Sequence, residues 1–144
     1  MKILVCTDGS KESDKTLEEA VKLVGSCENP EVSLIHVYSD KITFAYGDEV
    51  RTRDELERIM EGHKQAGEAL VEKARQFFEE KKISVKTILK NGHPAHVIVN
   101  TAHEEKFDMI VIGCRGLGGL KRLFLGSVSN AVLQEAKTNV LVVK

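Results

Sequence analysis

The sequence predicts an α/β protein: a single three-layer domain over residues 1–144, in which a five-stranded, mostly parallel sheet carries helices on both faces. Two observations support this prediction. Short apolar runs alternate along the chain with longer segments whose apolar residues recur at helical spacing. The first run, Ile3 to Cys6, is apolar at every position, as is typical of a strand covered on both faces. Strands that alternate with helices form parallel sheets, because right-handed crossovers connect them.

The first half of the chain is expected to contain two strands and two helices. A strand over residues 2–7 precedes a helix from about residue 13 to 24, which Gly25 closes. Residues 32–38 form the second strand, and a long helix follows from about residue 52 to 81. Apolar or small residues at helical spacing mark one face of this helix: Leu56, Ile59, Met60, His63, Ala66, Gly67, Leu70, Ala74 and Phe77.

The second half is expected to contain three strands and two helices. Residues 83–89 alternate between apolar and polar, which indicates a less buried strand near a sheet edge. Pro94 suits the first position of the next helix, whose inner face would carry Ala95, Ile98, Val99 and Ala102. Residues 107–112 form the fourth strand, 128–136 the last helix and 140–143 the fifth strand.

Composition limits the classes of partner. The 21 basic and 22 acidic residues nearly balance, so nothing in the overall charge indicates a nucleic-acid or membrane partner. The chain begins directly with a strand pattern rather than a signal peptide, and no apolar run approaches the ~18 residues of a membrane span. Three cysteines without a CxxC pair suit a reducing compartment. We therefore expect a cytoplasmic protein.

The segment after the fourth strand combines glycine with positive charge. It carries Arg115, Lys121 and Arg122 and no acidic residue, and its glycines are Gly113, Gly116, Gly118, Gly119 and Gly126. Ser127 stands where the N-cap of the last helix is expected, so its hydroxyl and the free amides behind it would face an anion. A glycine-rich loop between a strand and a helix is a typical phosphate site. A plain flexible connection is the alternative.

The spacing Gly-x2-Gly-x9-Gly-Ser, at Gly113, Gly116, Gly126 and Ser127, resembles the ATP-binding signature of the universal stress protein family. Further matches follow in order along nearly the whole chain, at residues 3–10, 34–37, 92–95, 126–129 and 140–143. On these motifs the chain resembles the ATP-binding subgroup of that family. Two positions depart from the family pattern, because Cys6 and Asn139 each stand where a proline is frequent.

The resemblance implies the strand order 3-2-1-4-5, with the reversal between the first and fourth strands. Ligands of such folds bind where the strand order reverses. The family resemblance also implies roles for site residues. Thr7 and Asp8 would contact the nucleoside, and the backbone of Val37 would contact the adenine. The phosphate contacts would come from Gly113, Gly116, Gly126, Ser127 and Val128. Residue chemistry alone leaves a second interpretation of Asp8 open, as a turn residue in Asp-Gly-Ser that satisfies its own backbone.

The resemblance implies an ATP-binding protein that acts as a nucleotide-dependent regulatory or stress-response module. The ATP would bind with or without Mg²⁺, and no metal site is expected from protein side chains alone. A slow ATP hydrolase and a dimeric scaffold that needs no nucleotide are the alternatives, and no catalytic residue is assigned. The resemblance also implies a homodimer through the last strand, from Val140 to Val143. The protein partner stays unidentified. We further hypothesise that residues 39–51 form a lid or partner-contact loop.

Other side chains permit weaker hypotheses. Cys6 and Cys114 would be neighbours if the first and fourth strands are adjacent, so they are either a redox-sensitive pair or ordinary buried thiols. His93 and His96 resemble part of the HxGH motif of nucleotidyl transferases, but in the wrong place and without its glycine. His96 and His103 could share a helix face, yet no third metal ligand completes a set.

Overall fold

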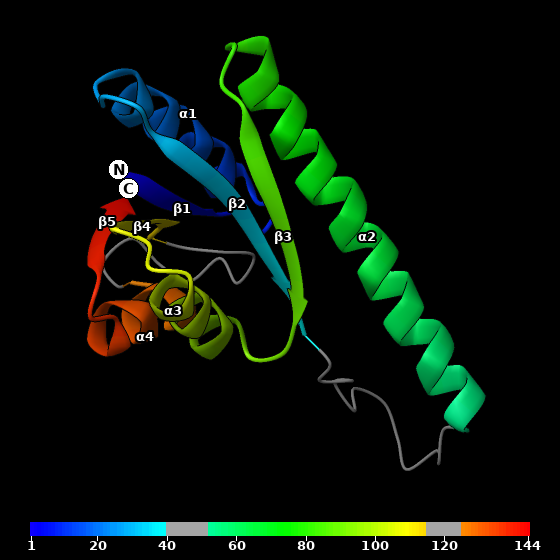
Figure 1. Cartoon of the computed structure of the whole chain (residues 1–144). Coiled ribbons are helices and arrows are strands. Elements are labelled where there is room, and N and C mark those ends of the chain that lie inside the picture. The colour runs from blue at the N-terminus through cyan, green and yellow to red at the C-terminus, as the bar shows by residue number, and fades with distance from the viewer. Residues whose placement is uncertain (40–51, 115–124) are drawn as a thin grey trace.

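The computed structural model describes residues 1–39, 52–114 and 125–144 (Figure 1). Strands and helices alternate through these residues as the sequence predicts. The strands are β1 (Lys2–Cys6), β2 (Glu31–Tyr38), β3 (Val85–Asn91), β4 (Met109–Gly113) and β5 (Asn139–Val143). The helices are α1 (Lys11–Gly25), α2 (Arg53–Glu80), α3 (Pro94–Glu104) and α4 (Ser127–Glu135). None of these helices is long and apolar enough to cross a membrane.

The strands form one parallel sheet in the order β3-β2-β1-β4-β5, which confirms the expected order. β1 lies at the centre, where Ile3 pairs with Val32 of β2 on one side and with Met109 of β4 on the other. β3 and β5 are the two edges, so the prediction that the third strand lies at an edge is also confirmed. Because all strands run the same way, their carboxyl ends share one side of the molecule.

Two hydrophobic cores lie on opposite faces of the sheet. On one face Ile3 and Val5 of β1 pack with residues of α1 and α2, including the fully buried Phe78. On the other face Leu4 and Cys6 pack with residues of α3 and α4. Successive side chains of a strand point to opposite faces, so β1 contributes to both cores. Figure 1 shows the resulting layers, with α1 and α2 on one side of the sheet and α3 and α4 on the other.

The third strand begins two residues later than predicted. Lys82 adopts a positive φ of 61°, and the N–H of Ile83 donates to the carbonyl of Phe78 at 3.0 Å. These contacts terminate α2 and occupy the residues that the alternating pattern assigned to a strand. Pro94 takes the first position of α3, as predicted.

The predicted inner face of α2 is only half right. Gly67 and Ala74 are buried as expected, but Val71 and Phe78 complete the buried face, whereas His63 and Ala66 are exposed. Figure 1 shows the reason, because the first half of α2 projects beyond the carboxyl ends of β2 and β3. Helical spacing alone does not tell which turns of a long helix meet the sheet.

Candidate functional site

The end of β1 and the end of β4 lie next to each other at the carboxyl side of the sheet. The two strands pair directly, with Leu4 opposite Ile110 and Val5 opposite Val111. Since β2 and β3 extend the sheet to one side and β5 to the other, the strand order reverses between β1 and β4. Such a reversal opens a crevice above the sheet, which is where ligands of open α/β folds bind. Thr7 and Asp8 follow β1 directly at this point.

Asp8 forms a tight turn at the beginning of α1. Its Oδ1 accepts hydrogen bonds from the N–H of Ser10 at 3.0 Å and from the Ser10 hydroxyl at 2.6 Å. Gly9 has a φ of +77°, which an L side chain rarely adopts. The turn interpretation of Asp8 is therefore correct for Oδ1. Among the described residues none hydrogen-bonds Oδ2.

A short polar network fixes the backbone under Asp8. Thr7 is buried, and its hydroxyl shares a hydrogen bond of 2.7 Å with the hydroxyl of Ser13. The same Ser13 oxygen lies 3.4 Å from the N–H of Asp8, and the Nδ1 atom of His36 lies 2.8 Å from the carbonyl oxygen of Thr7. Our sequence interpretation assigned no role to Ser13 or His36. The available signal for His36 was a polar side chain near the carboxyl end of the second strand.

The beginning of α4 differs from the prediction by one residue. The N-cap is Gly126, with extended φ and ψ of −62° and 158°, and its carbonyl accepts the first helical hydrogen bond from Asn130 at 2.9 Å. Ser127, predicted as the N-cap, is instead the first helical residue, followed by Val128. Gly126 has no side chain that could cap the helix, and the N–H groups of a first helical turn are donors that suit an anion.

A clamp joins the end of β4 to the beginning of α4. Cys114 follows Gly113, and its carbonyl accepts from the N–H of Gly126 at 2.7 Å. The buried Ser129 hydroxyl lies 3.0 Å from this same carbonyl and 3.0 Å from the carbonyl of Gly126. These bonds hold together the two ends of the glycine-rich segment. Sequence reasoning gave Ser129 no role, although a serine in a first helical turn commonly bonds to a nearby carbonyl.

The remaining predicted site residues divide into two groups. Val37 is buried on β2, near the same carboxyl side, with its side chain in the core shared with α3 and α4. Its expected contribution through the backbone is compatible with this position. Gly116 and the basic residues of the segment lie outside the described residues, as does the hypothesised lid at residues 39–51 except for Ser39 itself.

The thiol and histidine hypotheses receive little support. Burial raises the pKa of the Cys6 thiol, with the charge of Asp8 adding to the shift, so Cys6 is a protonated core residue at neutral pH. The Nδ1 atom of His96 on α3 lies 3.2 Å from the Oε2 atom of Glu135 on α4. Within the described ranges no three His, Cys, Asp or Glu side chains form a group that could hold a metal ion.

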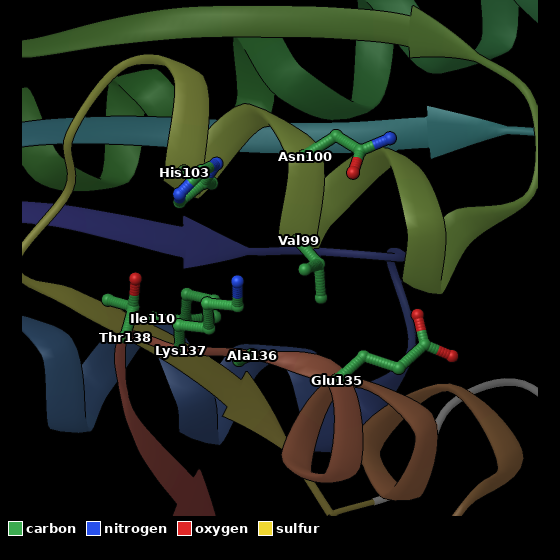
Figure 2. Close-up of a pocket in the computed structure, with 8 residues that line it drawn as sticks. All are labelled: Val99, Asn100, His103, Ile110, Glu135, Ala136, Lys137 and Thr138. Carbon is green, nitrogen blue, oxygen red and sulfur yellow. The ribbon is translucent and has the colours of Figure 1, made fainter.

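A cavity of about 300 Å³ lies elsewhere, between α3 and the connection from α4 to β5 (Figure 2). Its lining residues are Val99, Asn100, His103, Ile110, Glu135, Ala136, Lys137 and Thr138. Ile110 is near the beginning of β4 and Thr138 immediately precedes β5, so the cavity lies toward the amino ends of the strands. It is distinct from the carboxyl ends of β1 and β4, where Thr7 and Gly113 lie.

Comparisons with known proteins agree with this architecture. The model of the universal stress protein family matches residues 1–144. Universal stress protein YxiE of Bacillus subtilis is 37% identical over 146 residues, which cover 99% of this chain and 98% of that protein. The solved structure of MJ0577 from Methanocaldococcus jannaschii superposes with a TM-score of 0.85 at 28% identity, covering 99% and 94% of the two chains. The crystal structure of a universal stress protein in complex with cAMP has a TM-score of 0.71 at 27% identity, covering 100% and 97%.

Proposed function

Because this chain belongs to the universal stress protein family, we propose that it binds an adenine nucleotide, ATP, in the crevice between the ends of β1 and β4. One observation carries the proposal. The Asp8 turn follows β1, and the beginning of α4 is bonded to Cys114 just after β4, so both belong to the carboxyl side of the sheet where the strand order reverses. The cAMP complex of a relative supports an adenine ligand.

The proposed roles follow from the chemistry of each side of the crevice. The Oδ2 atom of Asp8 accepts a hydrogen bond from a ribose hydroxyl or an adenine amino group, with Thr7 beside it. Val37 reads the adenine through its backbone groups. The N–H groups of Gly113, Ser127 and Val128 donate to the phosphates, where the positive end of the α4 dipole favours an anion. Gly126 donates its own N–H to Cys114, so its proposed contribution is a close approach of the phosphates without a Cβ in the way. Gly116 is proposed to contribute in the same way on the strength of the signature spacing.

Mg²⁺, where it accompanies the nucleotide, would be held by the phosphate oxygens. The described residues offer no side-chain cluster for it, and phosphate-bound Mg²⁺ commonly keeps several waters. Nucleotide occupancy can regulate a partner only if the two states of the protein bind that nucleotide with different affinity. We propose that the protein is a nucleotide-dependent regulatory module of the stress response. Slow hydrolysis of ATP is the alternative that the binding experiment below distinguishes.

We also propose a homodimer through β5. This strand is an edge of the sheet, and an edge strand offers unpaired backbone groups to another copy. Leu141 on β5 is 37% exposed and Leu133 on α4 is 44% exposed, so apolar surface accompanies the open edge. A monomeric mass at micromolar concentration, measured by sedimentation or light scattering, would contradict this assembly.

The test of nucleotide binding has two parts. Mass spectrometry identifies any small molecule that the purified protein releases on denaturation, and calorimetry titrates the emptied protein with ATP, ADP and AMP. Asp8→Ala and Gly116→Val should both weaken ATP binding, while Glu80→Gln, an exposed change at the far end of α2, should not. Released ADP would favour slow hydrolysis. No released nucleotide and no heat would refute the proposal and favour the scaffold.

A further inference from the structure

His36 lies on β2 beside the proposed nucleoside site, but no part of the proposed function uses it. Its Nδ1 atom is 2.8 Å from the carbonyl oxygen of Thr7. A carbonyl oxygen can only accept a hydrogen bond, so Nδ1 carries the proton and donates it. The imidazole is thereby held in one tautomer, and β2 is joined by a side chain to the residue that follows β1.

Helix α2 covers this imidazole on its other side. A Cβ atom added at Gly67 would lie 3.1 Å from Cδ2 of His36, closer than most real Cβ contacts. One turn further along α2, Leu70 covers the Asp8 turn itself, because a Cβ at Gly9 would lie 2.6 Å from the Cδ1 of Leu70. Backbone of α2 therefore packs on the ring and a side chain of α2 packs on the turn, which leaves neither much room to move.

The hydrogen bond to Thr7 acts on Asp8 through one peptide group. The carbonyl of Thr7 and the N–H of Asp8 belong to the same planar unit and point in opposite directions. His36 holds the carbonyl end at 2.8 Å, and the Ser13 oxygen lies 3.4 Å from the N–H end. The plane of this peptide, together with φ at Asp8, sets the direction in which the Asp8 side chain leaves the backbone.

We propose that His36 is a positioning residue for nucleotide binding: its Nδ1–H orients the Thr7–Asp8 peptide so that the Asp8 carboxylate faces the nucleoside. The inference rests on the proposed function, because it needs a nucleotide at Asp8. His36 does not touch the ligand. Its contribution is one neutral hydrogen bond, so its loss should lower ATP affinity by about 2- to 12-fold, the range that such a bond gives.

Two substitutions separate the hydrogen bond from the shape of the ring. His36→Asn places an amide nitrogen two bonds from Cβ, at the same distance along the side chain as Nδ1, so it can still donate to Thr7. His36→Gln places its amide nitrogen one bond farther, where Nε2 lies in the imidazole. Calorimetric titration with ATP should therefore give an affinity within about twofold of the original protein for His36→Asn, and a clear loss for His36→Gln.

A double-mutant cycle with Asp8→Ala tests whether the effect passes through Asp8. If His36 acts by orienting that carboxylate, His36→Gln should cause no further loss of ATP affinity once the carboxylate is gone. An equal loss in both backgrounds would overturn the proposal, as would wild-type affinity in His36→Gln. A protein that binds no nucleotide in any form would instead refute the proposed function. Nitrogen chemical shifts of His36 in the unsubstituted protein give an independent check, because a proton on Nε2 alone would contradict the assigned hydrogen bond.

Discussion

Two glycines of α2 provide a matched test of how closely this helix packs on the site. Gly62 is exposed, and a Cβ added there would meet nothing within 4 Å. Gly67 is buried, and a Cβ there would lie 2.8 Å from the Cδ1 of Leu89 and 3.1 Å from the Cδ2 of His36. The end of the Leu89 side chain can rotate away. The imidazole of His36 cannot do so without lengthening its hydrogen bond to Thr7.

The expected free energies of unfolding follow from these contacts. Replacing glycine by alanine inside a helix stabilises it by about 1 kcal/mol. Gly62→Ala should show this gain in full. Gly67→Ala should gain as much from helix propensity, but overpacking of a tight site costs about 1–3 kcal/mol. The second variant should therefore be about 1–3 kcal/mol less stable than the first, despite the identical chemical change.

Calorimetric melting measures the difference directly. For a domain of this size 1 kcal/mol corresponds to about 4 °C in Tm, so Gly62→Ala should melt about 4 °C above the original protein. Gly67→Ala should melt at least about 4 °C below Gly62→Ala. Equal stabilisation by the two substitutions would show that α2 does not pack on His36 as closely as the structure indicates, and would refute the reasoning.

Three further predictions concern other groups. Ser129→Ala should lower the free energy of unfolding, measured by urea titration, by about 1 kcal/mol, because it removes the hydroxyl that bonds to the carbonyls of Cys114 and Gly126. The same change should weaken the binding of ATP more than that of AMP, because these bonds hold the phosphate side of the proposed site. Cys6 should resist alkylation until the protein unfolds, because burial raises the pKa of its thiol. Cys27 is more exposed and should react in the folded protein. Mass spectrometry after timed labelling measures the two rates. Hydrogen bonds from Arg75 lower the pKa of Glu72 to about 2, so its contribution to stability is present above its ordinary value of 4.5 and is lost as the pH falls toward about 2. Glu72→Gln should remove part of the loss of stability in acid. Because the Glu72–Arg75 pair is exposed, this effect should be small and should shrink at high salt. A urea midpoint of the original protein that does not change between pH 4.5 and about 2 would contradict the prediction.

The sequence allowed the order and type of the elements to be predicted because the strands differ in how their apolar residues are arranged. β1 is apolar from Ile3 to Cys6 and lies at the centre, whereas the alternating residues near β3 indicated an edge strand. Turn residues with strong local preferences, such as Pro94, placed helix starts well. The strand order came from the family resemblance, because spacing within a strand carries no information about its neighbours.

The details of the site depend on contacts between distant segments, which local patterns do not encode. The bond from His36 to Thr7 joins β2 to the end of β1, and the bond from Ser129 to Cys114 spans the glycine-rich segment. The N-cap moved from Ser127 to Gly126 because the N–H of Gly126 bonds back to Cys114, which fixes where α4 can begin. The sequence could indicate the chemistry of the site, but not the network that holds it.

The central place of β1 has a consequence for how the chain folds during synthesis. β1 emerges first and can pair with β2 early, but its other neighbour begins only at Met109. Until then the ribosome carries a part of the sheet whose open edge is β1, which is buried and apolar from Ile3 to Cys6. Such an edge favours pairing with other chains. Truncation before β4 should therefore yield aggregates or chaperone-bound fragments, and the closure of β4 onto β1 should limit the folding rate.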